Sequence, residues 1–135
     1  MIYVSRREVF SASHRLHNPA LNDEENRALF GKCNSPNGHG HNYTLIITVG
    51  GEIDPVSGYL IDLKKLKDIV KENVIDKVDH KNLNMDVDFL KGVITTTENL
   101  AVAFWKILAD KIPSGRLYSV KIAETENNFF EYKGE

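Results

Sequence analysis

The sequence predicts an α+β fold in a single domain spanning residues 1–135. Segments with strand periodicity and segments with helical periodicity follow one another in the order strand, strand, helix, helix, strand, strand. No repeat or linker divides the chain, and its length suffices for one core. We expect one four-stranded antiparallel sheet with two long antiparallel helices on one face. The uncovered face and the sheet edges favour assembly between subunits.

Composition excludes several classes of function. Hydrophobic residues make up 41% of the chain, charged residues 27%, and the net charge is −2, as is ordinary for a soluble globular protein. There is neither a long basic run nor an apolar stretch of membrane-spanning length. The first residues lack the apolar core of a signal peptide, and one cysteine cannot form an internal disulfide. We expect a cytoplasmic protein that binds neither nucleic acid nor membranes.

The first expected strand, Tyr3–His14, is rich in aromatic and β-branched residues and contains no Gly or Pro. Its alternation places His14 at the end of an apolar stripe, where a histidine can be a core residue or a ligand. His17, which follows in a loop, is the weaker candidate. The same parity turns Arg6 and Glu8 toward the buried face, so we expect a bulge or an exposed end there.

A long excursion separates this strand from the next. A short helix should start near Asp23, and Gly31 should end it. The stretch Gly31–Tyr43 then reads G-K-C-N-S-P-N-G-H-G-H-N-Y and contains the only cysteine. It leads into a second strand, His41–Gly50, which has an apolar stripe of its own.

The histidines of this stretch suggest a metal site. His39 and His41 project from the same face of the second strand because side chains alternate. Antiparallel pairing of the two strands would set His14 beside them. Three imidazoles with an open fourth position form the ligand set of a catalytic Zn2+ site. The alternative is a polar, glycine-rich loop whose histidines are neighbours by chance.

The first long helix should begin after Asp62, which can cap it, and run to about Ile75. Its lysine-rich outer face is interpreted as solvated surface rather than as a phosphate or nucleic-acid patch. An irregular polar segment follows and contains Asp79 and His80. These two residues can be a proton-relay pair, since a carboxylate can orient an imidazole, or a capping Asp beside an exposed His.

The second long helix is expected over Thr95–Lys111, with its first residue and Glu98 forming a capping box. Two strands, Leu117–Glu124 and Phe129–Lys133, close the chain. The carboxylate of Glu124 continues an apolar stripe and must find hydrogen-bond donors or shift its pKa upward. It can therefore anchor a ligand or belong to a structural ion pair.

These segments resemble the 6-pyruvoyl tetrahydropterin synthase family nearly from end to end. The longest matching motifs are F-S-A-S-H-R-L at Phe10 to Leu16 and the whole of Gly31 to Tyr43. The shorter ones are D-E-E-N at Asp23 to Asn26, G-E-I-D-P at Gly51 to Pro55, D-H-K-N-L at Asp79 to Leu83, T-T-E-N at Thr96 to Asn99 and E-T-E-N-N at Glu124 to Asn128. Together they are highly specific, whereas H-G-H alone would not be.

The resemblance implies a tunnelling fold, in which three subunits close a barrel and two trimers stack into a homohexamer. It implies an enzyme, a carbon–oxygen lyase acting on phosphates. That enzyme would convert 7,8-dihydroneopterin triphosphate to 6-pyruvoyl-5,6,7,8-tetrahydropterin in tetrahydrobiopterin biosynthesis, with release of triphosphate.

The resemblance also implies roles for individual residues. Carried over by motif, the zinc ligands would be His14, His39 and His41. The proton acceptor would be Cys33, and its relay partners, reaching in from a neighbouring subunit, would be Asp79 and His80. The catalytic set would be completed by the residue that anchors the pterin ring, Glu124. Further residues near the ring would be Thr96, Thr97 and Glu98.

Two alternatives remain. A sibling family, 6-carboxy-tetrahydropterin synthase, uses the same fold and substrate but typically has a shorter gap between the cysteine and H-x-H. Here Cys33 precedes His39 by six positions, which favours the pyruvoyl enzyme. A non-enzymatic, zinc-dependent assembly or binding protein would not need Cys33, Asp79 and His80 together.

Overall fold

The computed structural model describes all residues, 1–135, and is built on one sheet with the strand order β3-β1-β2-β4-β5. Its four longer strands are β1 (Ile2–His14), β2 (His39–Gly51), β4 (Arg116–Thr125) and β5 (Asn128–Tyr132). Neighbours among these four are antiparallel, whereas β3 (Lys81–Asn82) pairs with β1 in parallel. The α+β class is confirmed, but the expected four-stranded antiparallel sheet is wrong, since the sheet is mixed and has five strands. Because β3 has only two residues, it has no periodic pattern from which the sequence could have predicted it.

The pairing of β1 with β2 is unbroken from Ile2 opposite Gly51 to His14 opposite His39. Of the bulge or exposed end expected at Arg6 and Glu8, the bulge is therefore absent. These side chains are half-buried on the helix-covered face, and Arg6 Nη2 lies 2.8 Å from Glu8 Oε1. The ion pair satisfies the two charges locally, so the strand needs no bulge to expose them.

The first long helix runs further than its pattern indicated. It consists of α2 (Leu63–Val70), a π-helical turn (Lys71–Ile75) and α3 (Asp76–Val78). Asp62 caps it as expected, because its side chain accepts a 2.9 Å hydrogen bond from the Lys64 N–H.

The second helix, α4 (Thr97–Leu108), begins two residues later and ends three residues earlier than expected. Its cap is Thr96, whose hydroxyl accepts the Asn99 N–H at 3.3 Å. The predicted capping box of Thr95 and Glu98 is wrong by one position, because Thr95 is buried and used elsewhere. None of the helices is both long enough and apolar enough for a membrane crossing.

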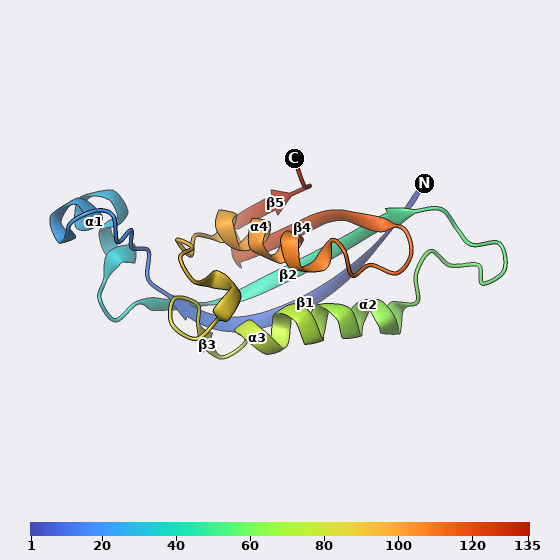
Figure 1. Ribbon diagram of the computed structural model, residues 1–135, viewed down its shortest axis with the longest axis horizontal. Helices are drawn as coiled ribbons and strands as arrows, with labels where there is room; N and C mark the ends of the chain where they lie inside the picture. The colour runs from blue at the N-terminus through green and yellow to red at the C-terminus, as the bar shows by residue number, and fades with distance from the viewer.

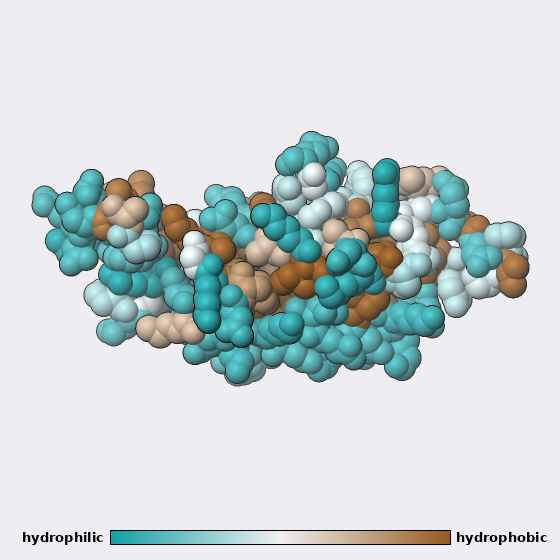
Figure 2. All heavy atoms as spheres, in the orientation of Figure 1, coloured by the Kyte–Doolittle hydropathy of each residue, from teal (hydrophilic) through white to brown (hydrophobic).

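Helices α2 and α4 lie on the same face of the sheet (Figure 1). The core between them and the sheet includes Phe10, Tyr43, Leu66, Leu100 and Phe104. In Figure 2 hydrophilic side chains cover the outer side of α2, and apolar side chains gather between α2 and α4. No element of the chain covers the opposite face of the sheet.

The excursion between β1 and β2, residues 15–38, extends beyond one end of the sheet (Figure 1). It contains α1 (Asp23–Phe30) and a 3-10 helix (Gly31–Asn34), and Gly31, which ends α1, has a positive φ of +57° that favours glycine. Two buried amides hold it. Asn26 bonds to the backbone of the segment before α1, and Asn34 Nδ2 donates to the Leu16 carbonyl at 2.8 Å.

Candidate active site

Three histidines converge where the strand ladder places them, at the end of the sheet from which the excursion extends. His14 is the last residue of β1 and pairs with His39, the first residue of β2. His41 lies two positions further along β2, on the same face. Their ligand atoms all lie within 4.8 Å of one another, and His14 Nε2 is 3.2 Å from His39 Nε2. His39 and His41 therefore lie in a paired strand, and not in the polar loop of the alternative.

The surroundings of His14 and His41 favour the neutral imidazole, which is the form that binds a metal ion. His14 is buried, and its Nδ1 lies 2.7 Å from the Thr95 carbonyl oxygen. A carbonyl can only accept, so Nδ1 carries the proton and Nε2 presents its lone pair to the other histidines. Burial lowers the pKa of His14 although this hydrogen bond acts in the opposite direction, and burial also lowers the pKa of His41. Both side chains are thus neutral near pH 7, the form that binds metals.

His41 supplies the sharpest test of whether a metal fits. Its Nε2 atom is buried and has no hydrogen-bond partner within the chain. A buried nitrogen without a partner is unfavourable unless something else satisfies it. A cation bound by His14, His39 and His41 would do so, and three imidazoles with one open position suit a catalytic zinc ion.

A carboxylate faces this group from β4. Glu124 Oε1 lies 3.5 Å from His41 Nε2 and 3.9 Å from His14 Nε2. These contacts are not ion pairs at pH 7, because both histidines are neutral there. Thr97, at the start of α4, donates a hydrogen bond from its hydroxyl to Glu124 Oε1 at 3.2 Å. No lysine or arginine pairs with Glu124, so the structural ion pair considered from the sequence is absent.

The other two residues expected near the pterin ring differ in position from Thr97. Thr96 caps α4, while Glu98 is exposed in the first turn of the helix and forms no side-chain hydrogen bond. Of this group, Thr97 alone contacts another candidate site residue.

Cys33 lies in the 3-10 helix and is half-buried. Its carbonyl oxygen accepts the Leu16 N–H at 2.9 Å, so the backbone around the cysteine is attached two residues after His14. The sulfur does not belong to the group of ligand atoms formed by the three histidines.

Asp79 and His80 lie along the outer edge of β1. Asp79 Oδ2 is 3.1 Å from His80 Nδ1, and the other carboxylate oxygen accepts the Ser11 N–H at 2.9 Å. The Ser11 hydrogen bond is the largest cause of the lowered pKa of Asp79. His80 has an unusual positive φ of 61°, and its own N–H donates to the Ser11 carbonyl oxygen at 2.6 Å. Such strain persists only where neighbours enforce it and is frequent at functional sites.

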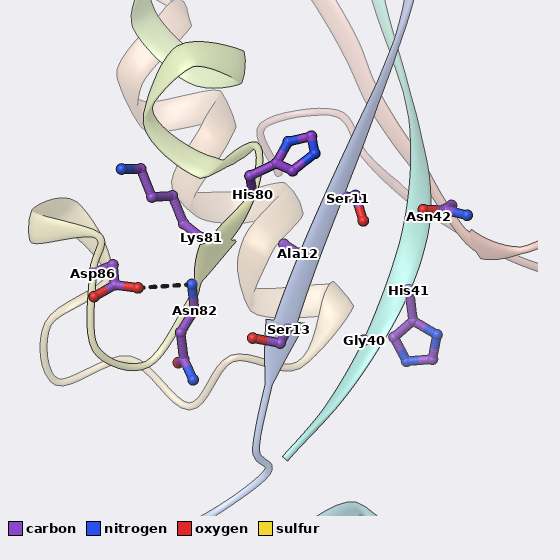
Figure 3. Close-up of a pocket in the computed structure, with 10 residues that line it drawn as sticks. All are labelled: Ser11, Ala12, Ser13, Gly40, His41, Asn42, His80, Lys81, Asn82 and Asp86. Carbon is purple, nitrogen blue, oxygen red and sulfur yellow. Dashed lines mark hydrogen bonds between the residues drawn. The ribbon is translucent and has the colours of Figure 1, made fainter. Parts of the chain in front are cut away.

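His80 also borders a polar cavity of about 610 Å³. Figure 3 shows this cavity, with His80 beside β1 and His41 on β2, and with Ser11 and Ser13 from β1 between them. No hydrogen bond within the chain joins Cys33 to Asp79 or His80. Within a single chain, therefore, no hydrogen bond joins the expected proton acceptor to its expected relay partners.

Sequence reasoning missed several residues that hold the site together. Asn84 accepts the Arg15 N–H at 2.8 Å and the Thr95 hydroxyl at 3.2 Å, and its amide donates to the Arg15 carbonyl. It thus fixes Arg15, which follows His14, and Thr95, which bonds to His14. Tyr43 lies under the histidines, and its buried hydroxyl has no partner. Burial raises the pKa of Tyr43, so the phenol is neutral.

Known proteins resemble this chain in sequence. The sequence profile described as 6-pyruvoyl tetrahydropterin synthase matches residues 3–135. The human 6-pyruvoyl tetrahydrobiopterin synthase is 55% identical over 132 residues, which is 98% of this chain and 91% of that protein. The Dictyostelium discoideum protein of the same name is 49% identical over 134 residues, which is 99% of this chain and 97% of that protein.

A solved structure agrees with these sequence relatives. The structure of Caenorhabditis elegans 6-pyruvoyl tetrahydropterin synthase matches with a TM-score of 0.94 at 46% identity and covers 99% of this chain and 96% of that one. Such identity over almost the full length of both chains goes far beyond a shared fold. The chain belongs to the 6-pyruvoyl tetrahydropterin synthase family of enzymes.

Proposed function

We propose that this enzyme converts 7,8-dihydroneopterin triphosphate to 6-pyruvoyl-5,6,7,8-tetrahydropterin, with elimination of triphosphate. This is the carbon–oxygen lyase step of tetrahydrobiopterin biosynthesis. The observation that carries the proposal is the convergence of three imidazoles opposite the carboxylate of Glu124, in a chain of this family. The histidines suit a metal ion at one end of a substrate, and the carboxylate suits a ring with several N–H donors at the other.

His14, His39 and His41 would hold the zinc ion through their unprotonated ring nitrogens. When bound, zinc would lower the pKa of hydroxyl groups on the substrate side chain. Glu124 would anchor the pterin by accepting a pair of hydrogen bonds from its amidine-like edge, and Thr97 would keep the carboxylate in place. The acidic carboxylate and the metal-binding histidines would thereby fix the ring and the side chain in one orientation.

Cys33 would accept a proton from the substrate side chain, with Asp79 and His80 of a neighbouring subunit as relay partners. Asp79 is held by Ser11 and in turn orients the ring of His80. As protons move from the side-chain carbons, the C=N bond of the dihydropterin ring is reduced to the tetrahydro level, and the hydroxyl-bearing carbons of the side chain become the two carbonyls of the pyruvoyl group. Triphosphate then leaves by elimination, so the electrons balance within the substrate and no external redox cofactor is required.

The proposal is tested by incubating the zinc-loaded protein with 7,8-dihydroneopterin triphosphate. We expect release of inorganic triphosphate together with a product whose mass is that of the pyruvoyl pterin. A carboxy pterin would instead identify the sibling activity of deazapurine biosynthesis. Absence of any turnover would favour a zinc-dependent binding or assembly protein.

We predict that Cys33→Ala keeps zinc, oligomeric state and substrate affinity but loses the proton-transfer step. General acid–base catalysis typically contributes about 10²–10⁴-fold, and kcat should fall within that range. Cys33→Ser should recover little, because a hydroxyl is a much poorer base at neutral pH. Single-turnover kinetics with a separate binding measurement checks this. Near-normal turnover in Cys33→Ala would require another base, with His80 the next candidate.

A further inference from the structure

The outer edge of β1 is only partly covered by β3, which pairs with Ala12 and Ser13. β3 therefore ends before it reaches His14, the last residue of β1, or Arg15, which follows it. We propose that the side chain of Asn84 completes this edge and thereby sets the affinity of the three histidines for zinc. The inference rests on the proposed function and assigns Asn84 as a positioning residue, which acts on the metal through other residues.

The amide of Asn84 takes the place of a further strand residue beside β1. Its Oδ1 accepts the Arg15 N–H at 2.8 Å, and its Nδ2 donates to the Arg15 carbonyl at 2.8 Å. These are the two backbone bonds that a neighbouring strand would otherwise make. Leu83, one residue earlier, donates its N–H to the Ser13 carbonyl at 2.8 Å. His14 therefore lies between two residues whose backbones are both held by the turn after β3.

A second contact connects Asn84 to the imidazole of His14. The Thr95 hydroxyl donates to Asn84 Oδ1 at 3.2 Å, and the carbonyl oxygen of the same threonine lies 2.7 Å from His14 Nδ1. Thr95 is fully buried, and within the chain its hydroxyl bonds to Asn84. Asn84 thus holds both the backbone beside His14 and the residue whose carbonyl orients the ring.

The turn that contains Thr95 is held on its other side by α4. The Thr96 N–H donates to the Ile94 carbonyl at 2.8 Å, and Asn99 Nδ2 donates to the same carbonyl at 2.8 Å. The turn is thus attached to α4 through Asn99 and to the edge of β1 through Asn84. Loss of the Asn84 side chain would remove the second attachment and leave a buried hydroxyl without a partner.

The position of His14 bears on metal affinity because a ligand that is already oriented loses little freedom when the metal binds. His14 is the only buried member of the histidine group, so neighbouring residues rather than solvent determine how its ring lies. Loss of an outer-shell partner of a metal ligand typically costs about 10–100-fold in metal affinity. Asn84 acts through Thr95 and Arg15, so we expect the lower end of this range.

The test measures the zinc affinity of the full-length chain by competition with a chromophoric chelator at neutral pH. Asn84→Ala removes the bonds to Arg15 and Thr95, whereas Asn84→Asp keeps an oxygen acceptor for both donors. The matched control is Asn73→Ala, which removes a comparable 2.8 Å amide–carbonyl hydrogen bond from the π-helical turn. The visible absorption of Co2+ bound in place of zinc reports the ligand geometry.

We expect Asn84→Ala to bind zinc about tenfold more weakly than the wild type, while Asn84→Asp and Asn73→Ala bind it almost as tightly. The Co2+ absorption should change in Asn84→Ala and return in Asn84→Asp. A role confined to closing the edge of β1 would instead lower the free energy of unfolding of Asn84→Ala and leave its zinc affinity unchanged.

A double-mutant cycle tests the path through Thr95. Thr95→Val removes the hydroxyl but keeps the carbonyl, and it should weaken zinc binding in the same direction as Asn84→Ala. The double variant should bind zinc no more weakly than Asn84→Ala, because both changes interrupt one path. If circular dichroism shows that Asn84→Ala does not fold, Thr95→Val alone decides, and normal zinc affinity in that variant refutes the path.

The proposal is overturned if Asn84→Ala binds zinc as tightly as the wild type, or loses no more affinity than Asn73→Ala. Additive losses in Asn84→Ala and Thr95→Val would overturn it as well. Failure of the proposed function is a separate result. A wild type that binds no zinc refutes the ligand set, whereas one that binds zinc with this dependence on Asn84 but does not turn over the substrate keeps the positioning role and refutes the reaction.

Discussion

At the scale of single residues, His14 combines two requirements that usually conflict. Its Nδ1 donates to the Thr95 carbonyl, which favours a protonated ring, while its burial favours a neutral one. Burial prevails, and the ring keeps a free lone pair on Nε2. The same carbonyl contact fixes the ring plane, so that metal affinity and orientation are both set by a residue 81 positions away in the sequence.

We predict that the free energy of unfolding of the metal-free protein falls as the pH drops below 6.5. The folded-state pKa values of His14 and His41 lie below the ordinary 6.5 because of burial. For each histidine, at a pH between its folded-state pKa and its unfolded-state pKa of about 6.5, the unfolded chain binds more protons than the folded one. The stability that each neutral, buried histidine contributes is therefore fully present above pH 6.5, and it is lost as the pH falls through the folded-state pKa. Its slope is at most about 1.4 kcal/mol per pH unit for each histidine.

Urea unfolding at a fixed chain concentration, measured from about pH 5 to pH 8, checks this prediction. His41→Asn removes one of the two titrating groups and should flatten the profile. A profile as steep in His41→Asn as in the wild type would show that other groups cause the acid sensitivity.

A second prediction at this scale concerns the metal. The wild type should bind one zinc ion per chain, and His39→Ala should remove a direct ligand. The loss of affinity should exceed the roughly 10–100-fold that follows from losing an outer-shell partner. The fold should persist, because the core does not include His39.

Elemental analysis and circular dichroism provide the two readouts for His39→Ala. The control is His80→Ala, which alters a histidine outside the ligand group and should retain zinc. Full zinc occupancy in the His39→Ala protein would refute the ligand assignment.

At the scale of elements, the excursion between β1 and β2 depends on buried amides rather than on apolar packing. Asn26 is fully buried in α1, whose other residues are largely exposed. Its side chain accepts the Asn18 N–H at 2.8 Å and donates to nearby carbonyls, including that of Asn18 at 3.0 Å. The amide closes the loop before α1 and so supports the segment that carries Cys33.

We predict that Asn26→Ala loosens this segment. Leaving the buried partners of Asn26 unsatisfied should lower the free energy of local unfolding by about 1–3 kcal/mol. The rate of limited proteolysis within residues 18–36 reports this free energy when opening is fast relative to cleavage. Asn37→Ala, at an exposed position in the same excursion, is the control. Equal cleavage rates in the two variants would contradict a supporting role for Asn26.

Elements with long periodic patterns were predictable from the sequence, because each residue reports its own burial. Alternation along β1 and β2 was enough to bring His14 to His39 and His41, since register follows from pattern. The remaining contacts link residues with no local signal. Thr95 fits the capping-box pattern in the sequence, yet its carbonyl accepts a hydrogen bond from His14, and Thr96 caps α4. Likewise, nothing near Asn84 in the sequence indicates that it bonds to Arg15 and Thr95.

At the scale of the whole molecule, one face of the sheet and both of its edges lack a cover within the chain. Val9 and Phe129 expose 48% and 60% of their surface on the open face, which an isolated subunit would leave in water. β5 forms one edge, and β3 covers only Ala12 and Ser13 of the other. Unpaired edges of this kind favour strand pairing between subunits. We therefore expect a trimer or, as a dimer of trimers, a hexamer of the 15.3 kDa chain.

The last prediction uses this assembly to test how the active site is shared. Cys33→Ala and His80→Ala proteins should each be inactive, because each lacks one part of the proton path. If His80 reaches the Cys33 of a neighbouring subunit, refolding the two variants together in equal amounts should restore roughly a quarter of the wild-type activity. An intact site then needs one chain of each kind in the correct order around the ring.

A site contained in one chain would give no recovery, because every mixed site would still lack Cys33 or His80. A solution mass equal to that of a monomer at micromolar concentration would exclude the shared site directly. Recovery in the mixture, together with a mass three or six times 15.3 kDa, would explain why no hydrogen bond within the chain joins Cys33 to Asp79 or His80. The strain at His80 would then serve to present its ring across the subunit boundary.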